Sequence, residues 1–130
     1  MNKKGFTLME LLAILVILAV IAVITIPIIL KVVENARRGS IRDSAYGYRD
    51  AINKYYLSKI SVDSLYSIEN GNYNISILRE MGVTVSGREP ENNSWVNIIN
   101  NVVIGGCLEF EGYKVEISDG VVGTAVRGSC

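Results

Sequence analysis

Few residues in this chain are of the types, and at the spacings, that could do chemistry. Its 130 residues include no histidine, which removes histidine-based acid–base catalysis and the Ser–His and Cys–His nucleophile pairs. Its two cysteines, Cys107 and Cys130, do not form a CxxC motif and are too few for a zinc site. Glu109 and Glu116 are expected opposite each other on neighbouring strands, where a solvated sheet face explains them better than a metal site. The sequence therefore predicts a protein that is not an enzyme and uses no cofactor or metal.

The charge balance argues against a dedicated nucleic-acid partner. The chain has 13 Lys and Arg residues and 13 Asp and Glu residues, so its formal net charge is zero, whereas nucleic-acid binding draws on excess positive charge. A local basic cluster of Arg37, Arg38 and Arg42 leaves a DNA-uptake binding module as one alternative. Because the cluster closely follows an apolar segment, contact with lipid phosphates or with solvent is the better interpretation. We therefore expect no nucleic-acid partner.

The apolar residues gather at one end of the chain. Residues 6–30 contain a single charged residue, Glu10, and residues 11–24 are apolar without interruption. As a helix that rises about 1.5 Å per residue, residues 6–30 would be roughly 37 Å long, enough to cross a bilayer core of about 30 Å. The apolar run is also longer than the h-region of a cleaved secretory signal peptide. The sequence therefore predicts a membrane-spanning helix.

Two residues of this segment are unexpected in a simple anchor. The carboxylate of Glu10 costs about 2.5–3.5 kcal/mol toward the bilayer centre, and Pro27 removes a backbone hydrogen bond and bends the helix. The flanking charges also matter, since fewer basic residues precede the segment than follow it. A positive-inside count would thus place the C-terminal part in the cytoplasm.

The start of the chain resembles the class III signal of type IV prepilins. Lys3-Lys4-Gly5-Phe6-Thr7-Leu8-Met9-Glu10 has a short basic leader ending in glycine, then phenylalanine, then glutamate four residues later, at the head of a hydrophobic run. The resemblance covers about residues 1–55, and Pro27 falls where many of these proteins carry a proline. It implies that the prepilin peptidase cuts between Gly5 and Phe6 and N-methylates Phe6. It also implies an N-terminus inside the cell, against the charge count, and later assembly into a helical filament.

Within such a filament, Glu10 would have a specific role. Leu, Ile and Val pack in almost any register, whereas a buried carboxylate must find a cation. The amine of Phe6, freed by cleavage, is the nearby cation, so Glu10 of one subunit would pair with Phe6 of its neighbour and fix their stagger. The alternative is a neutral Glu10 that reaches the lipid headgroups. Many family members have glycine before the proline, whereas this chain has Ala19 and Ala22. Flexibility would therefore come from Pro27 and from the β-branched run at residues 20–26.

Beyond the apolar segment, the chain predicts a second amphipathic stretch of helix that ends near Lys59. Apolar residues recur there at helical spacing, and their face is formed by Ile41, Ala45, Tyr48, Ile52 and Tyr55. Gly39-Ser40 interrupts this stripe and suggests a bend. Residues 60–92 read as irregular, apart from a short apolar piece at residues 75–81, and residues 87–93 read as an exposed loop.

The last part of the chain predicts an antiparallel meander with strands at residues 95–104, 107–111, 113–118 and 121–126. Gly112-Tyr113 suits a type II′ turn and Asp119-Gly120 a type I′ turn. These turns would pair Phe110 with Val115, Leu108 with Ile117, and Ile117 with Val122 on the face that covers the helix. The fold class is therefore α+β, a long N-terminal helix packed on a small antiparallel sheet, as in pilins.

An extracytoplasmic location would make a disulfide between Cys107 and Cys130 plausible, with free thiols as the alternative. It would close a loop of roughly 20 residues and contribute about 3 kcal/mol to stability. Residues 127–130 would have to fold back along the sheet for the two cysteines to meet.

These observations favour a structural subunit of a type IV pilus. Its parts would be a leader at residues 1–5, a transmembrane and filament-core helix at 6–30, and an extracytoplasmic domain at 31–130. The expected assembly residues are Glu10 and Pro27. The expected partners are other copies of the chain in a helical homopolymer, other pilins, the prepilin peptidase and the assembly platform in the cytoplasmic membrane. The alternative is a minor pilin or a pseudopilin of a type II secretion or DNA-uptake system.

Overall fold

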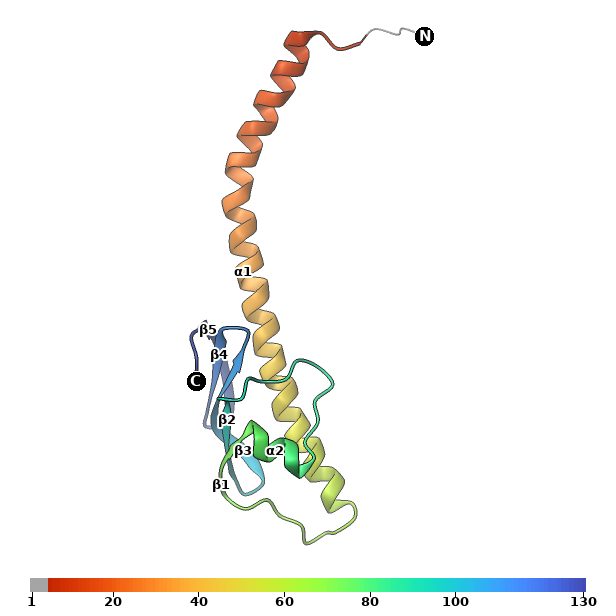
Figure 1. Ribbon diagram of the computed structural model, residues 1–130, viewed down its shortest axis with the longest axis vertical. Helices are drawn as coiled ribbons and strands as arrows, with labels where there is room; N and C mark the ends of the chain where they lie inside the picture. Colours follow the sequence, from red (N-terminus) through yellow and green to blue (C-terminus); the bar gives the residue numbers. More distant parts are fainter. Residues whose placement is uncertain (1–4) are drawn as a thin grey trace. The chain divides into compact units, whose positions relative to one another are not determined.

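A computed structural model describes residues 5–130, which form two compact units, one ending at Ala36 and one running from Arg37 to Cys130. A single helix, α1 (Leu8–Ile60), contributes to both units (Figure 1). The second unit also contains a short helix, α2 (Ile75–Met81), and an antiparallel sheet. Lys3 and Lys4 of the expected leader lie outside the described residues.

The part of α1 within the second unit is amphipathic, as the sequence predicts. Ile41, Ala45, Tyr48 and Ile52 are buried in the core, and Tyr55 packs against it while partly exposed. The helix continues without interruption through residues 39–40. A single glycine inside a helix costs only about 1 kcal/mol relative to alanine, which is less than the packing of this stripe contributes.

The sheet has five strands, and each pairs with the next one along the chain. They are β1 (Gly71–Asn74), β2 (Trp95–Ile99), β3 (Val102–Phe110), β4 (Tyr113–Ser118) and β5 (Val121–Arg127). The predicted α+β fold, a long helix packed on a small antiparallel meander, is thereby confirmed.

The reading of residues 60–92 as irregular is wrong at β1 and α2. Asn74 ends β1 and caps α2, because its side-chain oxygen accepts a hydrogen bond from the Ile77 amide at 2.9 Å. Gly82 ends α2 in the left-handed conformation, with φ of 110°. In the loop at 87–93, Pro90 is buried rather than exposed.

Three two-residue turns join the strands from β2 to β5. They are Asn100–Asn101, Glu111–Gly112 and Asp119–Gly120, and both residues of each have positive φ, as type I′ turns require. The type I′ turn predicted at Asp119-Gly120 is confirmed. The strand predicted over residues 95–104 is wrong, because the first of these turns divides it into β2 and the start of β3.

The type II′ turn predicted at Gly112-Tyr113 is also wrong, and this changes the register of β3 and β4. Phe110 pairs with Tyr113 instead of Val115, and Leu108 pairs with Val115 instead of Ile117. The shift is two residues, so the same side chains remain on the core face of the sheet. The predicted pairing of Ile117 with Val122 of β5 is confirmed.

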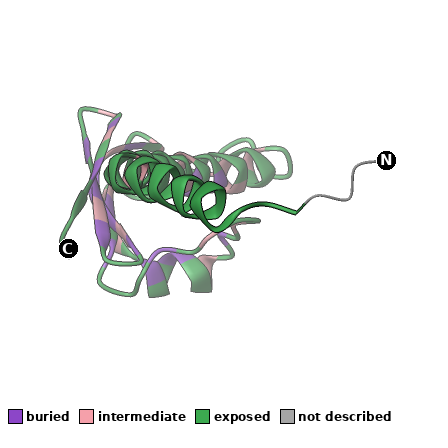
Figure 2. Ribbon diagram, turned by 90° about the horizontal axis from the view of Figure 1, so that it is seen from above, coloured by how far each residue is buried: buried purple, intermediate pink, exposed green. Residues whose placement is uncertain are grey.

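The hydrophobic core lies entirely within the second unit. Figure 2 shows the part of α1 before this unit as exposed, while the buried segments lie on the sheet, on α2 and on the later turns of α1. The largest fully buried side chains include Phe110, Ile41, Ile52, Ile75, Leu78, Ile98 and Leu108. Burial, and secondarily the carboxylate of Glu89, raise the pKa of Tyr48 to about 12, so this core phenol stays neutral at physiological pH.

Strands β2 and β3 approach each other closely next to a bulge at Asn97/Ile98. Gly106 has φ of 147°, and a Cβ there would lie 2.5 Å from the Trp95 carbonyl oxygen and 2.8 Å from the Val96 Cα. Only glycine fits this position. A Cβ on the preceding Gly105 would have its nearest neighbours at 3.7 Å, an ordinary contact.

Cys107 and Cys130 form a disulfide, with their Cα atoms 5.8 Å apart and 23 positions apart in sequence. The Gly128 amide donates a hydrogen bond to the Gly112 carbonyl at 3.1 Å, which continues the pairing of β4 with β5. The residues after Gly128 then fold back as expected and bring Cys130 to Cys107. Cys107 is buried in the sheet, whereas Cys130 is exposed.

We expect the Cys130→Ala variant to lose about 3 kcal/mol of the free energy of unfolding, because the unfolded chain is no longer cross-linked. The Cys107 thiol stays in its buried site, where it behaves as a small apolar group. Urea unfolding of the full chain in mild detergent, followed by the fluorescence of Trp95, the single tryptophan, measures the change. Ser129→Ala is the control in the same exposed tail. Equal stability of the two variants would contradict a stabilising role for the disulfide.

Candidate functional site

The first turn of α1 is closed by a reciprocal pair of hydrogen bonds. The Thr7 amide donates to Glu10 Oε2 at 3.1 Å, and the Glu10 amide donates to Thr7 Oγ1 at 3.2 Å. This is a capping box, in which a threonine at the N-cap and a glutamate three residues later satisfy each other's backbone donors. This motif is visible in the sequence as Thr7-Leu8-Met9-Glu10. It was missed because Glu10 was interpreted only as an isolated charge in a membrane segment.

The capping box gives Glu10 a partner within its own chain. The carboxylate has one hydrogen bond from Thr7, and its side chain is exposed. A carboxylate has about four lone-pair positions, so Glu10 can accept a further bond from a cation outside the chain. The box thus holds the carboxylate at the start of the helix and leaves capacity for an external partner.

The expected cleavage junction lies immediately before this turn. Gly5 and Phe6 precede α1, and the Phe6 side chain is 78% exposed. Thr7 and Glu10 both follow the junction, so the capping box contains no residue of the leader. Cleavage would leave the box intact and place a new amine next to it.

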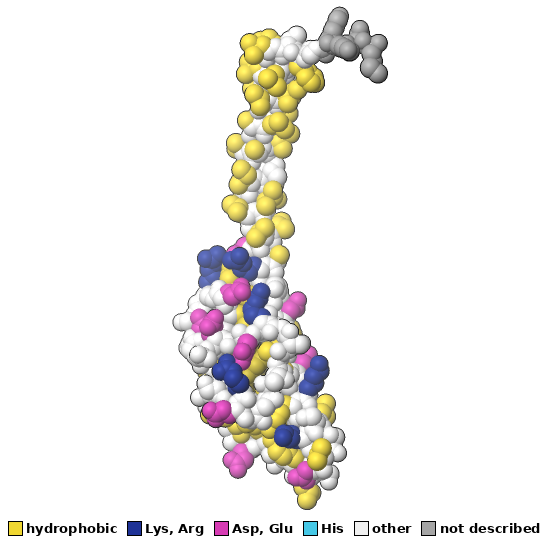
Figure 3. Space-filling model, turned by 45° about the vertical axis from the view of Figure 1, so that its right-hand side comes forward, with side chains coloured by type: hydrophobic (Ala, Val, Ile, Leu, Met, Phe, Trp, Pro, Cys, Tyr) yellow, Lys and Arg dark blue, Asp and Glu magenta, His cyan; other side chains and the backbone are white. Residues whose placement is uncertain are grey.

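The part of α1 between Glu10 and Lys31 exposes apolar side chains around its circumference. Leu11, Leu15, Leu18 and Leu30 are each about half exposed or more, and Figure 3 shows apolar side chains covering this part of the helix. The helix contains a stretch that is long and apolar enough to cross a membrane. Only a lipid environment or other protein surfaces would shield so large an apolar area from water.

Two side chains modify the backbone within this stretch. Thr25 Oγ1 donates to the Ile21 carbonyl at 2.6 Å, so its hydroxyl is satisfied within the helix. Pro27 lies inside α1 and has no amide to donate to the Val23 carbonyl. The proline therefore leaves a weak point in the hydrogen-bond ladder of the apolar helix.

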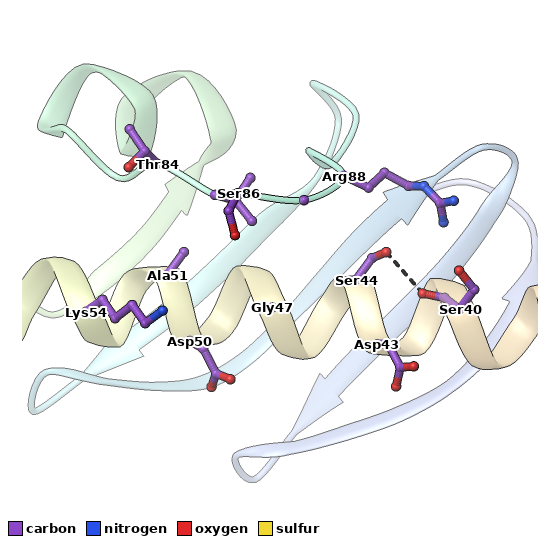
Figure 4. Close-up of a pocket in the computed structure, with 12 residues that line it drawn as sticks. Ser40, Asp43, Ser44, Gly47, Asp50, Ala51, Lys54, Thr84, Ser86 and Arg88 are labelled. Atoms are coloured by element: carbon purple, nitrogen blue, oxygen red, sulfur yellow. Dashed lines mark hydrogen bonds between the residues drawn. The ribbon is translucent and has the colours of Figure 1, made fainter.

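A groove of about 680 Å³ lies between α1 and residues 84–88 in the second unit (Figure 4). Its lining combines small and hydroxyl-bearing residues with four charged ones; the small and hydroxyl residues include Ser40, Ser44, Gly47, Ala51, Thr84 and Ser86, and the charged ones are Asp43, Asp50, Lys54 and Arg88. Ser44 Oγ donates to the Ser40 carbonyl at 3.0 Å. None of the lining residues is a histidine or a cysteine, so the groove lacks the usual base for activating a serine.

Glu109 and Glu116 do not form the opposed pair that the sequence suggests. Glu109 lies opposite Lys114, and Glu116 lies opposite Cys107, because of the shifted register. Lys114 donates to Glu116 at 3.2 Å, and Asn93 donates to Glu109. Within residues 5–130, no group of three or more His, Cys, Asp or Glu could hold a metal ion. Both carboxylates therefore have ordinary polar partners.

Comparison with known proteins identifies the N-terminal region. Residues 1–26 match the family described as the prokaryotic N-terminal methylation motif, which is the class III signal peptide of type IV pilins. No curated protein and no solved structure matches the chain. The motif, together with the long apolar helix and the α+β fold, supports a type IV pilin-like or pseudopilin-like protein. The motif indicates a structural role and implies processing by the prepilin peptidase.

Proposed function

We propose that this protein is a structural subunit of a type IV pilus, which polymerises through the apolar part of α1. The observation that carries the proposal is the exposed apolar surface of that helix, which directly follows the methylation motif. In a membrane, lipid would cover this surface. In a filament, the same helices of neighbouring subunits would cover it. The burial of apolar surface has no directional preference, so lipid and protein can each shield it from water.

In this proposal, the chain spans the cytoplasmic membrane once, with its N-terminus inside and residues 31–130 outside. The prepilin peptidase removes residues 1–5 and methylates Phe6, and the assembly platform then moves the subunit into a pilus on the cell surface. Glu10 of one subunit accepts the Phe6 amine of its neighbour, while Pro27 allows the helix to adjust in the filament core. Residues 37–130, with their own core, form the outer part of the subunit.

The intact mass of the chain in sheared surface filaments tests this proposal. We expect a protein that begins at Phe6, lacks residues 1–5 and carries one added methyl group. Cells without the prepilin peptidase are the control, and their chain should retain the leader and stay in the membrane fraction. Filaments that contain the uncleaved chain would contradict the proposal. Cleaved chain that is confined to the membrane, without surface filaments, would instead favour the pseudopilin alternative.

A further inference from the structure

A hollow of about 530 Å³ lies on the outer face of the sheet. Val96 and Ile98 of β2 are fully buried in the core, so their neighbours Trp95 and Asn97 point to the opposite, outer face. We call this space the tryptophan hollow; its lining includes Asn72, Trp95, Asn97, Gly105, Glu116 and Ser118, which all belong to the second unit. Its volume is within the range of small-molecule sites, about 300–1,000 Å³.

The strand register places the lining side chains of the hollow in rows across the sheet. One row contains Asn72, Asn97, Gly105 and Ser118, each opposite the next on the neighbouring strand. Gly105 has no side chain, so this row has a gap whose floor is backbone. Trp95 stands in the adjacent row, because it lies two residues from Asn97 along β2. A flat ring is thus placed beside a gap that polar side chains border.

Trp95 supplies most of the apolar surface that a ligand would meet in the hollow. The residue is 41% exposed, although a large aromatic side chain gains much free energy from burial. Ile99 and Ile104 line the same hollow and extend its apolar part. An indole ring has flat apolar faces and a polar N–H at its edge. The ring therefore suits a ligand that has an apolar face and a polar rim.

The polar groups around the hollow offer both donors and acceptors of hydrogen bonds. Asn97 Nδ2 donates to Asn72 Oδ1 at 2.6 Å, which leaves the amide nitrogen of Asn72 able to donate to another group. Asn97 Oδ1 is buried and has no hydrogen-bond partner within residues 5–130. Glu116 accepts a bond from Lys114 at 3.2 Å and, with about four lone-pair positions, can accept more. Together with the exposed Ser118 hydroxyl, these groups can bind a ligand that carries several hydroxyls.

This combination favours a neutral sugar over an anion or an apolar peptide. The described residues that line the hollow include one carboxylate and no lysine or arginine, so an anionic ligand would find no opposite charge there. An apolar peptide would cover the amides and Glu116 without offering them hydrogen bonds, which costs free energy. A pyranose ring with equatorial hydroxyls has C–H groups on both faces and hydroxyls around its rim. It can therefore stack on an indole and bond to the surrounding polar groups at the same time.

We propose that the tryptophan hollow binds a neutral β-linked pyranose unit of a glycan. The sugar ring stacks on Trp95, and its hydroxyls bond to Asn72, Glu116 and Ser118. The backbone floor at Gly105 lets the ring approach the sheet closely. The hollow lies within the second unit and involves neither the apolar segment nor an assembled filament. The proposal therefore goes beyond the pilus proposal, and either of the two can fail alone.

Calorimetric titration of the full chain, in a detergent whose headgroup is not a sugar, tests the proposal. The probes are cellotriose and triacetylchitotriose, which are uncharged β-linked trisaccharides, and sorbitol is the control because it has hydroxyls but no ring. We expect saturable binding of at least one trisaccharide with a Kd of about 1 mM or tighter, and no saturable binding of sorbitol. Binding of neither trisaccharide, or equal binding of sorbitol, would overturn the proposal.

Substitutions at exposed positions locate the binding. Trp95→Leu keeps an apolar side chain but loses the flat ring, so it should weaken binding at least about tenfold, whereas Trp95→Phe keeps a ring and should stay within about threefold. Asn72→Ala should also weaken binding, while Val126→Ala, at an exposed position of β5 outside the hollow, should not. Unchanged affinity in Trp95→Leu would place the sugar elsewhere and overturn the proposal. Loss of surface filaments in Trp95→Leu, with no sugar bound by the unaltered chain, would instead identify the hollow as a contact between subunits.

Discussion

Replacing Glu10 with alanine is expected to stop filament assembly while the chain still enters the membrane and is still cleaved. Insertion should become easier, because the substitution removes a charge from an apolar helix. Cleavage should continue, because Gly5 and the basic residues before it are unchanged. Assembly should fall by at least about a hundredfold, since an unpaired Phe6 amine in the filament core costs about 3–5 kcal/mol. Counting surface filaments and measuring the cleaved fraction of the chain together test this expectation.

The capping box makes two further variants necessary. Glu10→Gln keeps a side chain that can accept the Thr7 amide but loses the charge, whereas Thr7→Ala keeps the charge and loses the hydroxyl. If charge pairing controls assembly, Glu10→Gln should behave like Glu10→Ala. Thr7→Ala should then have a modest effect, since losing an N-cap costs about 1 kcal/mol. The opposite order, with Thr7→Ala severe and Glu10→Gln mild, would show that Glu10 acts as a helix cap and would contradict charge pairing.

Gly106→Ala is expected to destabilise the sheet more than any other single methyl group added to a glycine of this chain. The new Cβ would lie 2.5 Å from the Trp95 carbonyl oxygen, so β2 or β3 must move. Its φ of 147° adds backbone strain of about 1–3 kcal/mol for a residue with a side chain. With the clash included, we expect a loss of about 4 kcal/mol or more in the free energy of unfolding, which is large for one substitution.

Gly105→Ala is the matched control for this prediction. It adds the same methyl group to the neighbouring residue of β3, where the nearest atoms would be 3.7 Å away. Urea unfolding followed by the fluorescence of Trp95 measures both variants, and the probe lies beside the expected clash. Similar midpoints for the two variants would contradict the view that the close approach of β2 and β3 excludes a side chain at residue 106.

The sequence was sufficient to predict α1, and the reason is periodicity. An unbroken apolar run predicts a helix that is apolar on all sides, and the stripe that contains Ile41, Ala45 and Tyr48 predicts a helix with one buried face. The two stretches are continuous in α1. The face of each later strand was also predictable, because alternation within a strand survives a shift of two residues. Leu108 and Val115 accordingly face the core, although their register was misassigned.

The features that the sequence reading missed depend on local conformations with weak signals. The turn at Glu111-Gly112 requires positive φ at a glutamate, which residue preference disfavours. The turn at Asn100-Asn101 is hidden between apolar residues on both sides, so the run reads as one strand. β1 is short and polar and pairs only along one edge, so alternation cannot reveal it. The contact between α1 and β5, where Arg42 donates to the Val122 carbonyl, joins segments that are far apart in the chain, and spacing within one segment cannot show it.

The order of strands in the sheet, identical to their order in the chain, has a consequence for folding kinetics. From β2 to β5, each strand finds its partner by closing a turn of only two residues. The entropy lost on closing a loop grows with its length, and chains dominated by local contacts fold fast. The contacts of α1 with the sheet span far longer separations, such as that between Arg42 and Val122. In a chain that emerges across a membrane, the hairpins would therefore form first and α1 would dock on the sheet later. The sheet could begin to fold without waiting for a strand from a distant part of the chain.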